Sequence, residues 1–517
     1  MKLKLHTIGS LALAAVFASA CSDYLKEDSG DLLIPEKVSE FQAVLNGEGY
    51  PKTFAEDVAF TDLMTDNMTV MNGQSEDPNF AGAYDNITLS TGKGAYTWAR
   101  DIEYYTYDIA SAYENRYENI LACNTIIENE ETMLGADSER NYCVAQAYAL
   151  RAFNYFCLVN LYGLPYNKAT AATDMGVAIR LNSEVTREEF TRSTVQQVYE
   201  QINKDLDRAI ELFGKSTEDE NIFQMSLKAA LLLKTRVALY TENWDDAITY
   251  GEKLYATKLT LDNIGKLTPE EMMIQTQAES SPHYSFIKKS NPEILFNFGG
   301  TLDNPHKYIS SFIAYIDGPS FATSQTNAED LFNQYEEGDN RQYAFFMQDV
   351  TKTDGTMLKY IHTPTKHNSM YSRDCYKEAF RSAELFLNLA EAYIRKGGSE
   401  NEAKGISLLN ELRKSRFTAD TYVEKTAADF ASADDLLKFT WQERRRELCF
   451  DEMHRWFDLR REGMPRLVHK YRSAPNAAEE TYVLEQGDKN YTLALPKSET
   501  NYNTKIEKYE RRDINAQ

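Results

Sequence analysis

Two short stretches near the start of the chain combine aromatic rings with side chains that hydrogen-bond sugar hydroxyl groups. The first, TDN, contains Asp66 and Asn67, and the second, AYTWARD, contains Tyr96, Trp98 and Arg100. A neutral sugar is recognised by a flat aromatic face together with side chains that form paired hydrogen bonds to its hydroxyls. We therefore expect Trp98 to be a stacking platform, with the other four as supporting contacts. The alternative is that Trp98 only packs as the first turn of a following helix.

A second group of candidate contacts is made of tyrosines in the later half of the chain. Tyr308 and Tyr315 occur in HKYISSFIAY, and Tyr371 lies in a polar stretch. Tyrosine joins an apolar ring to a hydroxyl group, so it suits a binding surface as well as a helix interface. These three are further ligand contacts in our hypothesis, although many of the 33 tyrosines must lie in the core.

Arginine and carboxylate residues are frequent in WQERRRELCFDEMHRWFDLRR, residues 441–461. Spacings of three and four residues bring opposite charges together on one helix. One interpretation is a site for an anionic ligand. The interpretation we prefer is a scaffold helix, anchored by Phe450, Trp456 and Phe457 and fixed against its neighbours by ion pairs. The charged residues concerned are Glu443, Arg444, Glu447, Arg455, Asp458 and Arg461.

The sequence carries no motif that identifies a catalytic or metal site. Among 79 Asp and Glu residues, chance carboxylate pairs are expected, so no pair points to a glycosidase. The HExxH, GxSxG and phosphate-loop patterns are absent. His362 and His367 are separated by Pro364, and no two cysteines form a CxxC pair. We therefore expect no catalytic residues, no metal and no cofactor.

The first twenty residues are typical of an export signal. Lys2 and Lys4 precede an apolar run shorter than the roughly 20 residues needed to span a bilayer. Small residues then lead to Cys21, as in the lipobox of bacterial lipoproteins, where the cysteine thiol is acylated. Ala18 departs from the usual leucine, and the alternative is an ordinary cleavage site that leaves Cys21 as a free thiol. We expect a lipid-anchored tether over residues 21–35.

The net charge of −23 argues against two classes of partner. A chain this acidic is repelled by the negatively charged phosphate backbone of nucleic acids. It also lacks the basic face needed to adhere to an anionic membrane surface. Lipid on Cys21 is therefore the expected means of membrane attachment.

Helical spacing of apolar residues dominates the rest of the chain. The stretch from Tyr148 to Val159 places them on one helix face. Residues 226–255 predict two helices joined by a turn at Glu242–Asp245, and residues 381–414 predict another pair separated by Gly397 and Gly398. Both pairs resemble tetratricopeptide helix pairs. The small residues expected where paired helices touch are Ala238, Ala247, Ala390 and Ala403.

Two irregular stretches interrupt this helical pattern. Residues 50–100 are rich in Asn, Asp, Gly and Thr, and residues 262–375 hold Gly pairs, prolines and strand-like pieces such as EILFNF. Long irregular insertions on rigid scaffolds are where binding residues tend to lie. We expect ligand contacts in both stretches.

Several motifs occur in an order that resembles one known family. They are CSDYL at 21–25, RAFNYFCLVNLYGLPY at 151–166, NPEILFNF at 291–298, Asp339-Asn340-Arg341, AELFLNLAEAYIRKG with LLNELRKSR, the 441–461 block, and LALPKSETNYNTKI near the end. Together they are similar to the SusD/RagB family of Bacteroidetes outer-membrane lipoproteins, over nearly the whole chain. The chain departs from the family pattern at Asp451-Glu452-Met453, Leu495 and Lys497.

This resemblance implies a mainly α, SusD-like fold, with tetratricopeptide-like helix pairs on one flank and an irregular inserted lobe with short strands. The expected segments are a signal peptide at 1–20, the tether at 21–35, a helical scaffold at 36–261 with its ligand-loop region at 50–100, the inserted lobe at 262–375 and a C-terminal scaffold at 376–517. Family members often place ligand contacts in the loop region that precedes the first paired helices.

The resemblance also implies a function. Family members lie on the cell surface as lids over a SusC-like, TonB-dependent outer-membrane transporter, and they capture an oligomeric nutrient without catalysis. We expect an oligosaccharide as cargo; an oligopeptide is the alternative, because only four tryptophans are available for stacking. A surface glycoside hydrolase, which belongs to a different functional class, is the third and less favoured hypothesis. The sequence does not identify the sugar, its linkage or the length of the oligosaccharide that is bound.

Overall fold

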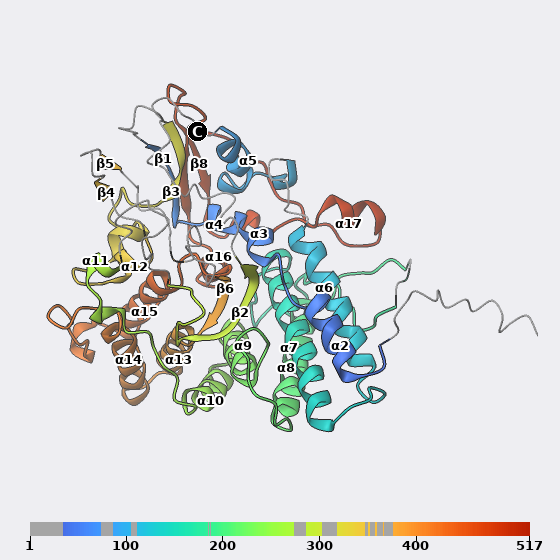
Figure 1. Cartoon of the computed structure of the whole chain (residues 1–517). Helices are drawn as coiled ribbons and strands as arrows, with labels where there is room; N and C mark the ends of the chain where they lie inside the picture. The colour runs from blue at the N-terminus through green and yellow to red at the C-terminus, as the bar shows by residue number, and fades with distance from the viewer. Residues whose placement is uncertain are drawn as a thin grey trace, which may run out of the picture.

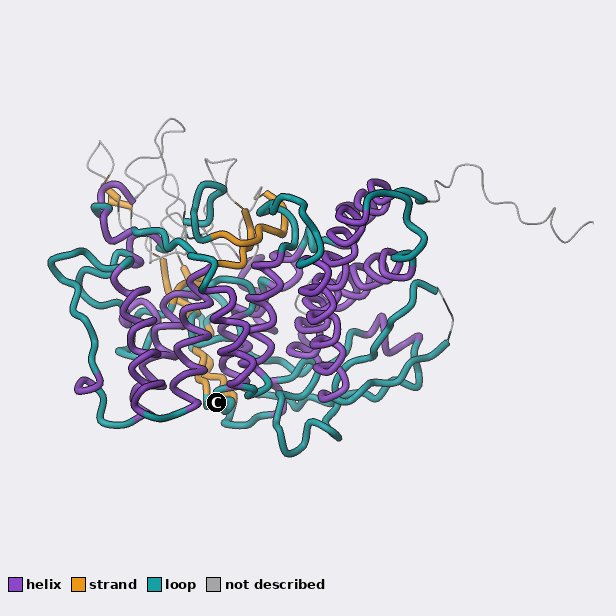
Figure 2. Tube along the Cα trace, turned by 90° about the horizontal axis from the view of Figure 1, so that it is seen from below, coloured by secondary structure: helices purple, strands orange, loops and turns teal. Residues whose placement is uncertain are grey.

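The computed structural model describes residues 35–73, 86–104, 111–184, 186, 188–272, 286–301, 318–346, 350–351, 357–358, 366 and 376–517. Helices (purple) make up most of this part of the chain, and strands (orange) occur as short pairs (Figure 2). The fold is mainly α, as the sequence predicts.

The long helices pack side by side in a row that runs from α6 to α15 (Figure 1). Helix α10 packs against α13, so the helices before and after the predicted insertion form one body. The row consists of α6 (Ser111–Glu128), α7 (Asp137–Tyr162), α8 (Val195–Phe213), α9 (Leu227–Tyr240), α10 (Trp244–Tyr255), α13 (Ser382–Lys396), α14 (Ser399–Lys414) and α15 (Ala433–Leu448).

The two predicted helix pairs are confirmed as α9–α10 and α13–α14. Asn243 caps α10 by accepting a hydrogen bond from the backbone N–H of Asp246. Gly397 and Gly398 separate α13 from α14 with φ values of 78° and 89°, which favour glycine. The expectation for Ala403 is wrong, because this residue is exposed. Gly405 lies at the helix contact instead, where an added Cβ would come within 2.8 Å of Ile394.

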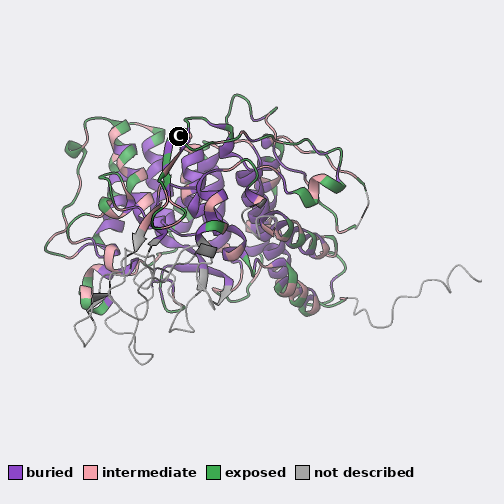
Figure 3. Ribbon diagram, turned by 90° about the horizontal axis from the view of Figure 1, so that it is seen from above, coloured by how far each residue is buried: buried purple, intermediate pink, exposed green. Residues whose placement is uncertain are grey.

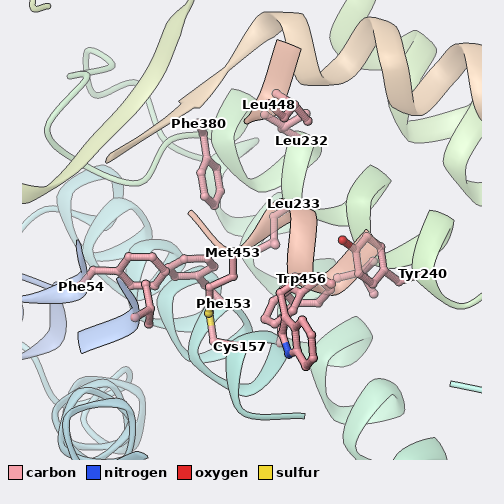
Figure 4. Close-up of a cluster of buried hydrophobic side chains, with 14 of the residues drawn as sticks. Phe54, Phe153, Cys157, Leu232, Leu233, Tyr240, Phe380, Leu448, Met453 and Trp456 are labelled. Carbon is pink, nitrogen blue, oxygen red and sulfur yellow. The ribbon is translucent and has the colours of Figure 1, made fainter. Parts of the chain in front are cut away.

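Helix α7 runs through the middle of the core, and its residues from Tyr142 to Tyr162 are almost all buried. Buried residues (purple) gather in these central helices, with exposed residues (green) toward the outside (Figure 3). Phe153 on α7 contacts the rings of Phe54 and Phe380 at centroid distances of 5.5 and 5.3 Å (Figure 4). It also contacts the ring of Phe298 at 5.5 Å. Full burial of one such side chain stabilises the fold by about 1.5–3 kcal/mol.

All the described strands form two-stranded antiparallel pairs. The pair β1–β3 joins the predicted ligand-loop region to the predicted inserted lobe, and β2–β6 leads directly into α13. The predicted strand EILFNF is confirmed as part of β2. The pairs are β1 (Met68–Gly73) with β3 (Gly318–Thr323), β2 (Ile294–Thr301) with β6 (Tyr376–Arg381), β4 (Val350–Thr351) with β5 (Met357–Leu358), and β7 (Leu467–Tyr471) with β8 (Glu480–Leu484).

Shorter helices complete the described structure. They are α2 (Val38–Val44), α3 (Phe54–Val58), α4 (Phe60–Leu63), α5 (Asn86–Tyr96), α11 (Pro269–Met272), α12 (Arg341–Ala344), α16 (His454–Arg461) and α17 (Lys497–Tyr502). Within the described ranges, no helix combines the length and the apolar character that crossing a membrane requires.

The charged stretch at 441–461 forms α15 and α16, and most of its ion pairs join different elements. Arg444 pairs with Asp458 across the two helices at 2.7 Å, and Arg461 reaches Glu391 on α13 at 2.6 Å. Glu447 is fully buried and contacts arginines from α12, from β6 and from the segment that follows α14. These carboxylates and guanidiniums satisfy one another inside the protein, so the scaffold interpretation is supported over an anionic-ligand site.

Candidate binding site

Tyr96 and Trp98 lie at the C-terminal end of α5, where the chain turns sharply into the next segment. Both are almost completely buried, and Trp98 adopts a φ of 50°. Their rings stack on opposite faces of the His469 imidazole, each with a centroid distance of 4.2 Å. The indole N–H of Trp98 donates to the carbonyl of Met64 at 2.8 Å. Trp98 thus has no ring face open to a sugar, and the platform role does not fit its position.

Asp66 and Asn67 hold the same region to the helical scaffold. The carboxylate of Asp66 accepts two hydrogen bonds of 2.8 Å from Arg455. Arg445 donates to the side-chain oxygen of Asn67 at 2.8 Å. Burial opposes ionisation of Asp66, but Arg445 and Arg455 outweigh it and hold the pKa of this carboxyl well below its usual range. Both side chains therefore have a structural partner, although Asp66 remains 28% exposed.

Arg100 lies on the surface, unlike the other candidates at the start of the chain. It lines a hollow of about 300 Å³, which we call the C-terminal hollow, between residues 100–103, Tyr162 at the end of α7 and the closing segment 493–511. The Arg100 guanidinium is 3.7 Å from the Asp513 carboxylate and 56% exposed, so a ligand can reach it.

The inner side of the C-terminal hollow is polar. The Tyr162 side chain is buried, and its hydroxyl has no hydrogen-bond partner within the described residues. Arg511 donates to the carbonyls of Ala99 and Asn490 and pairs with no described carboxylate. Burial lowers the pKa of Arg511 to about 10. The buried guanidinium of Arg511 therefore places a positive charge behind this wall, whereas the Tyr162 hydroxyl is itself enclosed by protein.

A second hollow, of about 480 Å³, lies on the other side of α17; we call it the tyrosine hollow. Tyr113 and Tyr117 come from α6, and Tyr502 comes from α17. Tyr502 is 87% exposed, so its ring is available for stacking. Arg180 lies over the Phe190 ring at 3.8 Å on the opposite rim. Carboxylates complete the lining, namely Glu114, Glu118 and Glu499.

The tyrosine hollow has the chemistry expected for a sugar site. Aromatic rings offer apolar faces, while carboxylates accept hydrogen bonds from hydroxyl groups and arginine donates to them. Because α17 contributes to both hollows, a ligand that reaches across this helix would contact Arg100 at one end and Tyr502 at the other.

The sequence prediction missed Tyr113, Tyr117 and Tyr502. A signal for the first two exists, because AYENRYENI repeats Tyr-Glu-Asn at a spacing of four residues and so places both tyrosines and both glutamates on one helix face. Tyr502 lies in a polar closing stretch, and no local pattern distinguishes it. The candidates Tyr308, Tyr315 and Tyr371, and the lipidation candidate Cys21, lie outside the described residues.

A third group of titratable residues lies deep in the scaffold. Glu384, Glu452 and His454 bring potential ligand atoms within 4.8 Å of one another. Arg236 already pairs with both carboxylates, at 2.6 and 2.8 Å. Its guanidinium supplies the positive charge that a metal ion would bring, so this group acts as a buried ion-pair cluster.

Comparison with known proteins identifies the family. Residues 22–239 match a SusD-like family model described as starch-binding and associating with the outer membrane, and residues 317–511 match the model of the SusD family. The chain belongs to the SusD family. A search of curated proteins finds no match to this sequence.

Several solved structures from Bacteroides species share this fold. A putative sugar-binding protein from Bacteroides vulgatus is 20% identical with a TM-score of 0.65, and the alignment covers 92% of this chain and 99% of that one. A SusD superfamily protein from Bacteroides fragilis is 23% identical with a TM-score of 0.62, covering 91% and 99%. Surface glycan-binding protein A from Bacteroides uniformis is 18% identical with a TM-score of 0.60, covering 91% and 98%.

Proposed function

We propose that this protein is a cell-surface lipoprotein that captures an oligosaccharide and delivers it, without catalysis, to a SusC-like TonB-dependent outer-membrane transporter. The observation that carries the proposal is the match of residues 22–239 to a SusD-like model described as starch-binding and associating with the outer membrane. Glycan-binding relatives of the same fold, including a laminarin-binding SusD-like protein, support the same class of cargo.

The two hollows beside α17 supply a surface for such a cargo. Tyr502 offers an exposed ring for stacking, and Arg100 offers an open guanidinium at the other end. In this proposal the sugar chain lies across α17. Tyr308, Tyr315 and Tyr371 stay candidate contacts on the grounds of their residue type alone. Tyr96, Trp98, Asp66 and Asn67 have a structural role in this proposal, because they join the 50–100 region to β7, α15 and α16.

Attachment to the outer membrane is proposed to rest on lipid at Cys21, with residues 21–35 as the tether. A mass of the mature protein larger than its polypeptide by an acyl modification, and its loss in Cys21→Ser, is the expected result. Recovery of Cys21→Ser in the membrane fraction at the wild-type level would contradict the anchor.

Calorimetry against glycan and oligopeptide libraries tests the cargo. Heat released with a glycan, and none with peptides, is expected. Binding of peptides alone would keep the lid role and replace the cargo with an oligopeptide. Incubation with the bound glycan, followed by an assay for new reducing ends, tests the absence of catalysis, because turnover would show a glycoside hydrolase.

The transporter partnership is tested in solubilised outer membranes. The protein is expected to copurify with a large β-barrel protein from a strain that expresses both. Recovery only as a free lipoprotein would contradict the lid role.

A further inference from the structure

Two arginines beside the C-terminal hollow are buried without a carboxylate partner. Arg460 on α16 donates to the carbonyls of Asn160 and Gly163, and Arg511 also donates only to backbone carbonyls. Neither guanidinium forms an ion pair with a described residue, although both side chains are almost completely buried. Every other arginine that is buried in the described part of the chain pairs with an aspartate or a glutamate. Two unbalanced positive charges thus lie beside this hollow in a chain with a net charge of −23.

Arg460 and Arg192 both lie at the C-terminal end of α7. Arg192 is half-buried, has no ion-pair partner among the described residues and donates to the carbonyl of Tyr162 at 2.8 Å. The last turn of α7 contains no basic residue of its own. A helix C-terminus carries a negative partial charge of about half an elementary charge, so two guanidiniums more than compensate for it. Helix capping therefore accounts for only a small part of their positive charge.

These buried charges make the inner side of the C-terminal hollow electropositive. Arg511 belongs to its lining, while Arg192 and Arg460 bind the carbonyls of the lining residue Tyr162 and of its neighbour Gly163. Burial lowers the pKa of both Arg460 and Arg511 to about 10, so both stay positively charged near pH 7. Their nitrogen atoms need no contact with a ligand, because a charge inside a protein is screened little over such short distances.

Two exposed cations in the same lining can contact a ligand directly. They are Arg100, which is 56% exposed, and Lys508, which has no ion-pair partner among the described residues. Arg100 faces the exposed carboxylate of Asp513 at 3.7 Å. An exposed pair at this distance is weak, so the guanidinium is free to turn toward a ligand. The hollow thus combines accessible donors with a positive potential behind them.

Three acidic residues also line the C-terminal hollow, and two of them are already bonded. Lys497 pairs with Asp101 and donates its backbone N–H to Glu103 at 3.0 Å. The third, Glu510, is exposed to solvent, where its charge is screened. These carboxylates reduce the positive potential of the hollow, but they do not pair with the buried guanidiniums.

The tyrosine hollow, on the other side of α17, has the opposite charge. Glu114, Glu118 and Glu499 line it, against one cation, Arg180. The Arg180 guanidinium is already engaged, since it lies 3.8 Å from the centroid of the Phe190 ring. A negatively charged group is therefore repelled on this side of α17 and attracted on the other side.

We infer that the C-terminal hollow binds the carboxylate of a hexuronic acid unit through Arg100 and Lys508, while neutral units of the same glycan lie in the tyrosine hollow. A guanidinium can donate two parallel hydrogen bonds to a carboxylate, and the hydroxyls of the uronic acid bond like those of a neutral sugar. This inference rests on the proposed function for its choice of a glycan. It adds the class of glycan and its direction, with the acidic unit at Arg100 and neutral units toward Tyr502.

Calorimetry with glycans that differ only in one carboxylate tests this preference. The glycans are cellohexaose, laminarihexaose, maltohexaose and mannohexaose. Each is used as the neutral sugar, as a derivative with one terminal unit oxidised to a uronic acid, and as the methyl ester of that derivative. We expect the wild type to bind at least one uronate roughly tenfold more tightly than its methyl ester and its neutral form. The difference should shrink at high salt, because ions screen the exposed cations.

Arg100→Gln is the decisive variant, because it removes an exposed guanidinium and should leave the melting temperature unchanged. It is expected to bind the uronate and its methyl ester with equal affinity. Arg466→Gln is the matched control, since Arg466 is 53% exposed, pairs with the exposed Glu485 at 3.3 Å and lines neither hollow beside α17. This control should keep the preference for the uronate. Arg511→Gln should weaken the preference and Arg511→Lys should retain more of it; if these buried variants do not fold, Arg100→Gln still decides.

The outcomes separate this inference from the proposed function. Equal affinity of the wild type for the uronate and the methyl ester of every glycan that it binds would overturn the inference and leave the proposed function standing. An equal loss of preference in Arg100→Gln and Arg466→Gln would also contradict it. No binding of any glycan by the wild type would overturn both. Binding of tetra-alanine, but not of its C-terminal amide, at Arg100 would replace the uronic acid with a peptide and so contradict the inference.

Discussion

Trp98 stacks on His469 with their ring centroids 4.2 Å apart and their planes 24° from parallel. The two residues come from the end of α5 and from β7, so this contact joins opposite ends of the chain. Both ring nitrogens of His469 face backbone carbonyls, those of Tyr96 at 2.6 Å and Thr65 at 3.1 Å. Burial lowers the pKa of His469 to about 4, while the hydrogen bonds to the carbonyls of Tyr96 and Thr65 act in the opposite direction. The stack fixes the loop region against the β7–β8 hairpin.

Trp98→Ala is therefore expected to affect folding more than binding. Removing a fully buried indole leaves a cavity and should lower the free energy of unfolding by about 3–5 kcal/mol. Urea denaturation measures this loss, and calorimetry at a temperature where the variant stays folded measures affinity. Weaker glycan binding by a variant of wild-type stability would restore the stacking role that the sequence suggested.

Tyr502→Ala is expected to behave in the opposite way. The ring is 87% exposed, so the melting temperature should change little. Loss of one stacking ring should cost roughly 0.5–1.5 kcal/mol, which weakens glycan binding by about twofold to twelvefold. Tyr255→Ala is the matched control, because Tyr255 is also exposed but lies on α10, away from both hollows beside α17. Equal affinity of the two variants would remove Tyr502 from the site.

Arg236→Met should be severely destabilising. Arg236 forms hydrogen bonds of 2.6–2.9 Å with both carboxylates of Glu384 and Glu452, and all three side chains are buried. The variant leaves two buried carboxylates without their cation, which costs about 3–5 kcal/mol in the free energy of unfolding. Arg208→Met removes a partly exposed pair with Glu130 and should cost no more than about 1 kcal/mol. Similar losses in both variants, measured by urea denaturation, would contradict this ranking.

Asp62 makes the free energy of unfolding depend on pH, and a single substitution can separate its contribution from that of other groups. Burial, and next the neighbouring carboxylate of Asp451, raise the pKa of Asp62 from 3.8 to about 8, against the pull of Lys366. The folded state thus keeps a proton that the unfolded chain releases, and stability falls as the pH rises through this window. Asp62→Asn removes this fall, so the variant should exceed the wild type by roughly 1–3 kcal/mol at pH 8 and match it near pH 4.

Asp66→Asn is the control for this experiment. Arg445 and Arg455 hold the pKa of Asp66 low, so its stabilising effect is present above its usual pKa and is lost only as the pH falls through the lowered value. This variant should be less stable than the wild type by the same amount at pH 6 and pH 8. A stability difference between Asp62→Asn and the wild type that stays constant from pH 4 to pH 8 would show that Asp62 does not titrate in this range.

The sequence predicted the helical scaffold well because its signals are local. The apolar spacing lies within each helix, and Gly397 and Gly398 lie directly between the two, so α13 and α14 could be predicted from the local sequence. The environment of Trp98, in contrast, is set by residues that are distant in the sequence. Its burial depends on His469 and on the carbonyl of Met64, and no pattern around AYTWARD reports either partner.

The candidate site shows the same limit. Residue types suited to sugar binding were recognised at Asp66 and Asn67, but their arginine partners lie on α15 and α16. Tyr117 and Tyr502 become neighbours in one hollow only after α17 packs beside α6.

The C-terminal hollow has walls from residues 100–103 and from residues 493–511, which meet only in the completed fold. The affinity of a ligand for this hollow therefore reports whether these two segments, distant in the sequence, have packed together. A proteolytic cut that releases the closing segment would open one wall while leaving every long helix intact, so loss of binding would precede loss of helical circular dichroism. The same property makes ligand retention a stricter assay of correct folding than secondary structure content.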